Sequence, residues 1–181
     1  RKLLKDTCKV AATFGAKGVI VHGGSVGEGG DIGQGYENWG KAIKEVEDIG
    51  VKVLVENTAG GKNSVARYMD SIERLWEVIG HLNVGLCLDT CHTWAGGIPT
   101  IEAVKGFKKL VKKIDLIHFN DSKDGFESSR DRHENLGKGQ IPKEELEYVI
   151  KNAKTDIIVE TPNGPDAQKK DIAWIKRRLK K

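Results

Sequence analysis

The chain has 181 residues, enough for one domain with a buried core, and its 38% hydrophobic and 31% charged residues exclude a disordered chain. No apolar run approaches the roughly 20 residues of a membrane helix and nothing resembles a signal peptide, so we expect no membrane partner. A net charge of +4 permits a nucleic-acid partner without requiring one. The three cysteines, Cys8, Cys87 and Cys91, are too few for a disulfide scaffold and favour a reducing, cytoplasmic location.

Helices and short apolar strands alternate along the chain, and the pattern repeats five times. Apolar side chains at intervals of three and four residues predict the helices, and continuous apolar runs predict the strands. In chain order, the predicted elements are a helix at 1–18, a strand at 18–25, a glycine-rich loop at 26–35, a helix at 36–50, a strand at 51–61, a helix at 65–80, a strand at 84–88, a helix at 101–114, a strand at 115–122, a polar segment at 123–140, a helix at 142–153, a strand at 155–162 and a helix at 167–180.

Several predicted helices follow residues that favour a helix start. We expect Asn63 or Ser64 to cap the helix after the second strand, Thr100 the helix after the third strand, and Asp166 the last helix. Pro142 suits the first position of its helix, where no N–H is needed. Because the strands are continuous apolar runs rather than alternating ones, they predict a parallel sheet covered by helices. We therefore predict one α/β domain over residues 1–181.

Each predicted strand ends in, or is followed at once by, a residue that can bind a metal ion. These residues are His22, Glu56, Asp89, His118 and Glu160. The C-terminal ends of parallel strands meet at one edge of a sheet or at the mouth of a barrel, where functional residues gather. A carboxylate buried there is costly without compensation, so carboxylates and imidazoles that converge favour a bound cation.

Each of these residues also has a plain structural explanation. A histidine before two glycines suits a turn, a carboxylate after a strand suits a helix cap, and a single histidine in a strand suits a satisfied core position. Five such residues at five strand ends are nonetheless hard to attribute to separate coincidences. Cys87 and Cys91 lack the spacing of a zinc ribbon and are expected to fill space in the core, and His81 is expected at the surface.

Three further residues extend the candidate metal site. His92 lies three residues beyond Asp89, and the polar segment after the fourth strand contains the run Asp131-Arg132-His133. Residues two apart on an extended segment face the same way, so Asp131 and His133 can act together. With His92 they make a nitrogen and oxygen ligand set suited to zinc, with room for water or a substrate.

Four segments of the chain resemble one known family. The segments are VENTAGG, GLCLDTCHTWAGG, HFNDSKDGFESSRDRHENLGKGQI and IIVETP. Together they resemble the endonuclease IV family of apurinic/apyrimidinic (AP) endonucleases, and the DTCH and DRHENLGKG blocks are the most specific. The resemblance implies a TIM (β/α)8 barrel of the xylose-isomerase-like type, with up to three zinc ions at the C-terminal mouth. It also implies cleavage of double-stranded DNA on the 5′ side of an abasic site, which leaves a 3′-hydroxyl.

The resemblance also assigns roles to the candidate residues. It implies that Glu56 bridges two zinc ions and that Glu56 and Glu160 are catalytic. Arg132 lies between two ligands and is expected to point away from them toward DNA, where Arg130 and Lys138 add phosphate contacts. The implied zinc ligands are His22, Glu56, Asp89, His92, His118, Asp131, His133 and Glu160. By the family pattern, the third zinc site consists of His92, Asp131 and His133.

The resemblance further implies that the chain corresponds to strands four to eight of the family barrel, or its C-terminal five-eighths. The family has one more zinc-binding histidine, in the site that contains His22, and loops that enter the DNA; neither has a counterpart in this sequence. Gly23 stands where the family pattern usually has proline, which we expect to loosen the loop without removing a ligand. No protein partner is evident from the sequence.

Two other functions remain open at this point. Glu56, Asp89, His118 and Glu160 alone would match a sugar isomerase or epimerase of the same barrel type, which uses one divalent metal. The ligands of the third site argue against this alternative, because such an enzyme has no use for them. The second alternative is a partial barrel that binds metal or DNA without turnover. Metal stoichiometry and an assay on abasic DNA would separate these possibilities.

Overall fold

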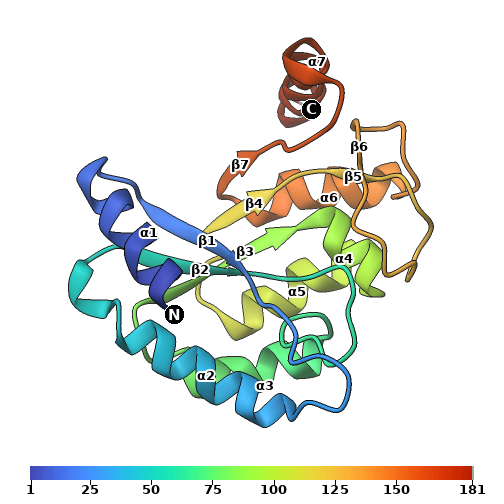
Figure 1. Ribbon diagram of the computed structural model, residues 1–181. Coiled ribbons are helices and arrows are strands. Elements are labelled where there is room, and N and C mark those ends of the chain that lie inside the picture. The colour runs from blue at the N-terminus through green and yellow to red at the C-terminus, as the bar shows by residue number, and fades with distance from the viewer. Residues whose placement is uncertain (181) are drawn as a thin grey trace.

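The computed structural model describes residues 1–180, and its centre is a five-stranded parallel sheet. The strands are β1 (Gly18–His22), β2 (Lys52–Glu56), β3 (Val84–Asp89), β4 (Leu116–His118) and β7 (Asp156–Ile158). They lie side by side in the order in which they follow one another along the chain (Figure 1). This sequential parallel order confirms the predicted α/β architecture.

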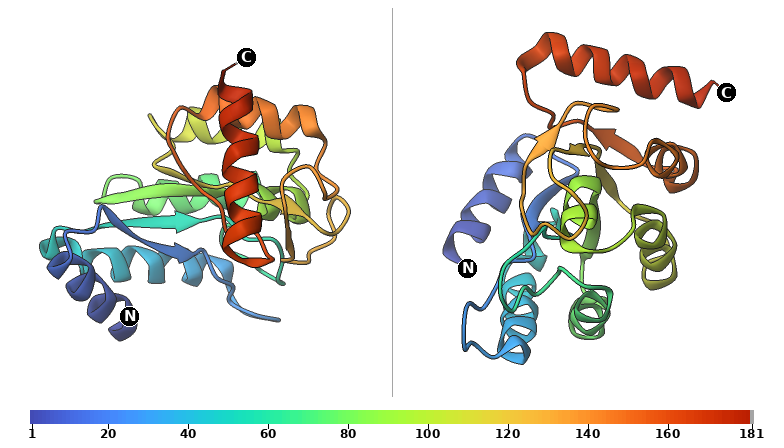
Figure 2. Two further views of the ribbon diagram at one scale, coloured as in Figure 1. Left: turned by 90° about the horizontal axis from the view of Figure 1, so that it is seen from above. Right: turned by 90° about the vertical axis from the view of Figure 1, so that its right-hand side faces the viewer.

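Helices pack around the sheet, and four of them cover one of its faces. The helices are α1 (Lys2–Thr13), α2 (Ile32–Lys44), α3 (Met69–Ile79), α4 (Thr90–Gly96), α5 (Thr100–Leu110), α6 (Lys143–Ala153), α7 (Gly164–Leu179) and the short 3-10 helix η1 (Glu47–Ile49). Figure 2 shows α2, α3, α5 and α6 following one another in an arc around the strands, and each packs against the next. In the described part of the chain, no helix is long and apolar enough to cross a membrane.

The core lies between the strands and this arc of helices. Leu75 and Ile79 of α3, Phe107 of α5 and Leu86 of β3 are all buried in one apolar cluster. The inner strands β2 and β3 are buried in continuous runs, whereas β1 and β7 at the two edges of the sheet are more exposed. A second cluster joins α1, β1 and α2 around Cys8.

Several helix starts differ from the sequence prediction. The helix predicted from residue 65 begins at Met69, and neither Asn63 nor Ser64 caps it. The Ser64 hydroxyl instead donates to the Gly60 carbonyl (2.5 Å), which stabilises the loop between β2 and α3. The helix predicted from residue 36 begins at Ile32, inside the predicted glycine-rich loop, because Asp31 caps it by accepting from the Gly33 N–H (2.8 Å).

Two further predicted caps lie inside their helices. Thr100 is the first residue of α5, and the Glu145 carboxylate accepts from its N–H (2.6 Å), so Glu145 satisfies a helix-start donor from outside the helix. Asp166 lies in the first turn of α7, where a carboxylate is favoured by the helix dipole. Pro142 directly precedes α6.

The C-terminal ends of the strands meet at one edge of the sheet. His22 pairs in register with Glu56, and Asp89 pairs with His118. The fifth residue, Glu160, lies two residues beyond the end of β7. The polar segment after β4 folds back over this edge as an antiparallel ribbon of β5 (Asp121–Ser122) and β6 (His133–Glu134). The ribbon therefore carries His133 to the strand ends.

Candidate metal centre

All eight predicted ligands converge at the C-terminal edge of the sheet. They form overlapping groups whose ligand atoms lie within 4.8 Å of one another. The groups without cysteine are His22, Glu56 and His92; then Glu56, Asp89, His118 and Glu160; and finally His92, Asp131 and His133. The structure thus brings together residues that are up to 138 positions apart in sequence, from 22 to 160.

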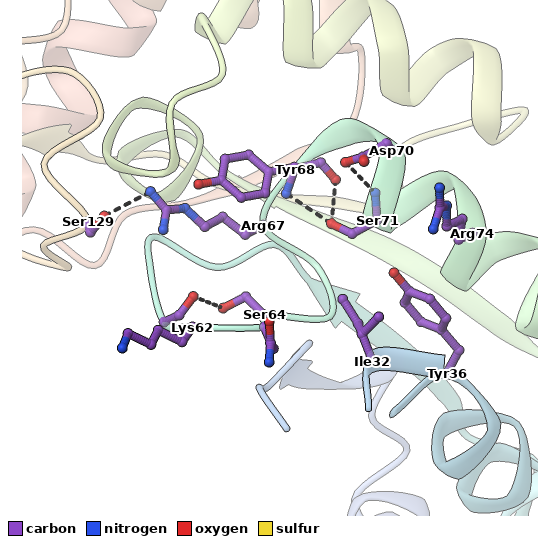
Figure 3. A pocket seen from close by; sticks show the side chains of 12 residues that line it. Ile32, Tyr36, Lys62, Ser64, Arg67, Tyr68, Asp70, Ser71, Arg74 and Ser129 are labelled. Carbon is purple, nitrogen blue, oxygen red and sulfur yellow. Dashed lines mark hydrogen bonds between the residues drawn. The ribbon is translucent and has the colours of Figure 1, made fainter. Parts of the chain in front are cut away.

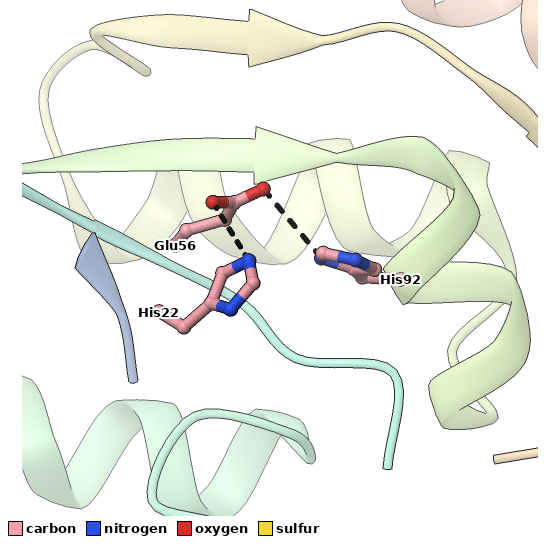
Figure 4. Close-up of side chains that lie close together, drawn as sticks. All are labelled: His22, Glu56 and His92. Atoms are coloured by element: carbon pink, nitrogen blue, oxygen red, sulfur yellow. Dashed lines mark ion pairs between the residues drawn. The ribbon is translucent and has the colours of Figure 1, made fainter. Parts of the chain in front are cut away.

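Glu56 occupies the centre of the cluster, and its side chain is only 4% exposed. One oxygen, Oε1, lies 2.8 Å from His118 Nδ1 and 3.5 Å from His92 Nδ1. The other oxygen, Oε2, lies 3.3 Å from His22 Nε2, and Figure 4 shows His22 and His92 each approaching one oxygen of the carboxylate. Each oxygen therefore faces a different histidine, which is the geometry that a bridging carboxylate needs.

The charges around Glu56 are strongly coupled. Burial alone would raise the pKa of Glu56, but hydrogen bonds and charges from His118 and His22 outweigh it and lower that pKa to about 2. Burial alone would lower the pKa of His118, but Cys87, Glu160 and Glu56 outweigh it and raise that pKa to about 12. Glu160 Oε2 lies 3.1 Å from His118 Nδ1. The carboxylates of Glu56 and Glu160 thus place two negative charges beside one imidazole nitrogen. A divalent cation can neutralise these charges.

The third group has two histidines whose orientation is fixed from behind. His92 Nδ1 lies 2.9 Å from the Asn57 carbonyl, and His133 Nδ1 lies 3.2 Å from the Glu160 carbonyl. A carbonyl only accepts, so each Nδ1 carries the proton and each Nε2 presents a lone pair in the neutral ring. Metal-binding histidines typically have this backing contact.

Both Nε2 atoms face Asp131. Its Oδ1 lies 3.0 Å from His92 Nε2 and 3.2 Å from His133 Nε2. Both nitrogens are nevertheless buried and make no hydrogen bond of good geometry in the described part of the chain. Buried polar atoms without a partner are rare in native proteins. Two lone pairs and one carboxylate aimed at a common point fit a zinc ion.

The carboxylates and imidazoles of the third group also shift one another's pKa values. Contacts with His133 and then His92 lower the pKa of the Asp131 carboxyl. Burial would lower the pKa of His92, but Asp89, Asp131 and Glu56 outweigh it and raise that pKa to about 9. Imidazoles and carboxylates are thus held together, and a cation can take the place of the bound proton.

Asp89 is both a helix cap and a member of the metal cluster. Its side chain is fully buried, and Oδ1 accepts from the His92 N–H (2.8 Å) at the start of α4. Its other oxygen, Oδ2, accepts from Asn120 Nδ2 (2.7 Å) and lies 3.7 Å from His133 Nε2. Burial raises the pKa of the Asp89 carboxyl.

Two asparagines that the sequence analysis did not single out support the ligands. Asn57 exchanges two hydrogen bonds with the backbone of Asp89, at 2.8 and 3.2 Å. Asn120 is fully buried and joins Asp89 Oδ2 to the Glu160 N–H, which donates to Asn120 Oδ1 (2.8 Å). Each follows a ligand closely in sequence, so a polar residue just after a strand end is the signal that identifies them.

Two of the three cysteines lie beside the candidate ligands. Cys87 and Cys91 are buried free thiols whose sulfur atoms lie within 4.8 Å of candidate ligand atoms. Burial raises the pKa of both thiols, for Cys91 to about 12. Both side chains are fully buried in the core, as predicted. His81 is exposed, also as predicted.

Gly23 is held more firmly than the sequence suggested. Its N–H donates to the Glu56 carbonyl (2.9 Å), and its own carbonyl accepts from Trp39 Nε1 (2.8 Å). A Cβ at this position would lie 2.2 Å from the Cβ of Ala66. The expectation of a loosened loop was wrong, because glycine permits close packing and supplies an N–H that proline lacks.

The predicted DNA-contact residues lie at the surface. Arg132 donates to Asp124 through Nε (2.6 Å) and Nη2, and Arg130 Nη1 lies 3.6 Å from Asp124. Lys138 is exposed on the loop after β6. Arg132 is therefore oriented by a carboxylate on its own loop and not by the metal ligands on either side of it.

A cavity of about 310 Å³ opens onto the metal centre. Its wall includes His22, His92 and Asp131, and the opposite side is formed by the loop after β2. The side chains of His22, Asp131 and Glu160 are 58%, 50% and 43% exposed, whereas Glu56 and His92 are almost fully buried. The centre is thus open to a ligand on one side and enclosed on the other.

The chain is similar to known proteins over nearly its whole length. A family model described as xylose isomerase-like TIM barrel matches residues 1–178. The probable endonuclease 4 of Mycobacterium tuberculosis is 48% identical over 178 residues, which cover 98% of this chain and 69% of that protein. The probable endonuclease 4 of Mycobacterium ulcerans is 46% identical over 179 residues, or 99% of this chain and 70% of that protein.

Solved structures give the same relationship. Endonuclease IV from Thermus thermophilus superposes with a TM-score of 0.77 at 30% identity, over 98% of this chain and 66% of that one. A D-tagatose 3-epimerase-like protein, at 19% identity and a TM-score of 0.75, shares the fold over 97% of this chain and 67% of its own. The chain thus spans about two-thirds of the relatives it matches. From the family match over nearly its whole length and these identities, the chain belongs to the endonuclease IV family of xylose isomerase-like TIM barrels.

Proposed function

We propose that the protein is a zinc-dependent DNA repair endonuclease that hydrolyses the phosphodiester on the 5′ side of abasic sites and leaves a 3′-hydroxyl. The observation that carries this proposal is the set of three overlapping ligand groups around Glu56, Asp89 and His92. The names of its relatives support a nuclease. We also propose that the five strands of the main sheet, which are β1, β2, β3, β4 and β7, correspond to strands four to eight of a family barrel.

The donor set suits up to three zinc ions. Glu56 would bridge two of them, His22 would bind one, and Asp89, His118 and Glu160 would complete the other. The third would be held by His92, Asp131 and His133. When bound, closely spaced zinc ions supply a hydroxide at neutral pH and neutralise charge on the phosphate.

The protein's own residues orient this chemistry. Asn57, Asn120 and the carbonyl of Glu160 hold the ligands from behind, so little reorganisation is needed when charge develops. Asp124 holds Arg132 at the surface of the same loop as Asp131. We propose that Arg132, Arg130 and Lys138 contact DNA phosphates, which positions the duplex without reading its sequence. An abasic nucleotide leaves the helix easily, since no base pair must break.

A single-metal sugar isomerase would require only the group of Glu56, Asp89, His118 and Glu160. It would not explain why the buried Nε2 atoms of His92 and His133 both face Asp131, at 3.0 and 3.2 Å, outside that group. The third group therefore favours the nuclease. A zinc content above one per chain, measured by elemental analysis, would support this choice, and one zinc bound by the four-residue group would contradict it.

The test of the function is the Glu160→Gln variant on duplex DNA with one abasic site. The variant keeps the shape of the side chain and loses a charged metal ligand. We expect cleavage to fall by on the order of a hundredfold or more while the duplex still binds, since the metals stabilise charge that develops in the transition state. Glu144→Gln, on the exposed start of α6, is the matched control. Binding that falls in step with cleavage would instead identify Glu160 as a structural residue.

A further inference from the structure

A second cavity, of about 620 Å³, adjoins the metal cavity. Ser64 and Ser129 line both cavities, so the two lie next to each other beside the loop after β2. Figure 3 shows Arg67 and Tyr68 on one side of the second cavity, with Arg74 and Tyr36 near each other on another. A chain molecule bound at the metal centre therefore has a direct path into this cavity.

Arg67 lies in the cavity wall, and its guanidinium has no carboxylate partner among residues 1–180. Its Nε donates to the Gly96 carbonyl (3.1 Å), and its Nη2 donates to the Ser129 hydroxyl (2.8 Å). The guanidinium also lies over the Tyr68 ring, 4.7 Å from the ring centre. All of these partners are neutral, so they fix the position of the guanidinium and leave its positive charge available to a ligand.

Arg74 supplies a second guanidinium to the same cavity. Its side chain is exposed on α3, and within residues 1–180 it makes no hydrogen bond or ion pair. The one carboxylate in the wall, Asp70, accepts from the Ser71 N–H (2.8 Å) at the start of α3. Lys62 adds little, because it pairs with Glu28 (2.5 Å) outside the cavity. The Ser71 N–H is neutral, so Asp70 keeps its negative charge, and the two arginines together leave the wall with a net positive charge.

We propose that this cavity binds a backbone phosphate of the DNA strand, next to the phosphate that reaches the metal centre. The inference rests on the proposed function for the identity of the ligand as DNA. Guanidinium groups match phosphate oxygens with paired hydrogen bonds, and a strand that leaves the metal cavity past Ser129 presents its next phosphates to Arg67 and Arg74. The contact positions the strand and is independent of sequence.

The test compares Arg74→Gln with Lys109→Gln in the full chain loaded with zinc. Lys109 lies exposed on α5, outside both cavities, so its variant loses the same charge. Binding of an undamaged duplex, measured at several salt concentrations, reports phosphate contacts without cleavage. We expect Arg74→Gln to weaken binding roughly three- to tenfold and to reduce the slope of log affinity against log salt by about 0.9, and Lys109→Gln to change neither.

A second variant, Arg67→Lys, keeps the charge and removes the fork, so it should weaken binding while the salt slope stays near that of the parent. Equal slopes for Arg74→Gln and the parent would overturn the inference, as would a parent chain that binds no duplex. A parent that cleaves abasic DNA with no dependence on Arg74 refutes this site and leaves the proposed function intact. A parent that shows the Arg74-dependent slope but cleaves no abasic DNA supports this site and contradicts the proposed function.

Discussion

Asp89 performs two tasks at once. Its Oδ1 caps α4 by accepting from the His92 N–H, and its Oδ2 lies among the ligand atoms beside His133. The carboxylate can be explained as a helix cap or as a candidate metal ligand. Both explanations can hold, because a different oxygen serves each role. The cap also places His92, because the first turn of α4 starts at a fixed point on the strand end.

The third ligand group should bind metal independently of the Glu56 pair. We expect His133→Ala to remove about one zinc per chain and to leave most of the remaining zinc, since only one group loses a ligand. Elemental analysis of the purified parent and variant measures this difference. His81→Ala, at an exposed histidine, is the control and should keep the full zinc content. Equal zinc in parent and His133→Ala would refute the assignment.

Asn120 should affect metal binding without touching the metal. Asn120→Ala leaves Asp89 Oδ2 and the Glu160 N–H without their shared partner, so both ligands lose orientation. We expect a loss of metal affinity of roughly 10- to 100-fold, measured by competition with a chromophoric chelator. In the control, Asn152→Ala removes one hydrogen bond within α6, to the Tyr148 carbonyl. If both variants lose affinity equally, Asn120 has no specific role in placing the ligands.

Among the helices, α7 is tied to two ligand-bearing segments through one residue. Asp171 is buried and accepts from Asn135 Nδ2 (2.8 Å), the Leu136 N–H (3.0 Å) and the Thr161 hydroxyl (2.6 Å). Asn135 lies two residues after His133, and Thr161 directly follows Glu160. The last helix therefore holds both ligands in place from outside the sheet.

We expect Asp171→Asn to destabilise the fold by about 1–3 kcal/mol, because buried donors lose a charged acceptor. For a chain of this length, thermal unfolding should shift down by roughly 2–12 °C. Calorimetry or circular dichroism gives the midpoint. Asp166→Asn is the matched control on the exposed first turn of α7 and should shift the midpoint much less. Comparable shifts in the two variants would exclude the anchoring role of Asp171.

The sequence predicted the strands and the candidate ligand positions more accurately than it predicted the helix starts. The five strands of the main sheet were predicted because each is a continuous apolar run that ends at or near a polar residue. The start of α3 was predicted wrongly, because the loop contacts of Ser64 with Gly60 and of Val65 with Gly24 are not visible in a local pattern. The candidate ligands could be selected from the sequence because most lie at or near a strand end, whereas Asp171 acts across 35 residues and requires the folded chain.

The described chain has an open sheet edge at β1, and beside this edge α1 and the residue that follows it expose apolar side chains. Leu3 and Phe14 are 80% and 82% exposed. Unpaired strand edges and exposed apolar groups favour association. We expect a protein of these 181 residues to associate with increasing concentration, and Leu3→Lys combined with Phe14→Lys to reduce this association.

Sedimentation velocity over a range of concentrations measures the effect. Ile172→Lys is the control, since Ile172 is an exposed apolar residue on α7, away from the β1 edge (Figure 1). We expect this variant to associate as the parent does. A parent chain that remains monomeric at high concentration would show that α1 and β1 do not promote association.

The sequential order of the strands also sets the order in which the metal centre can form during synthesis. Each strand from β2 onward pairs with the sheet strand before it, so this sheet can grow strand by strand as the chain leaves the ribosome. His22 and Glu56 meet once β2 is added, and His92 joins them on α4 after β3. The group around His118 remains open until Glu160 emerges. We therefore expect metal loading of that group to be a late event, and a nascent chain stalled before residue 160 to hold Glu56, Asp89 and His118 without the fourth member of their group.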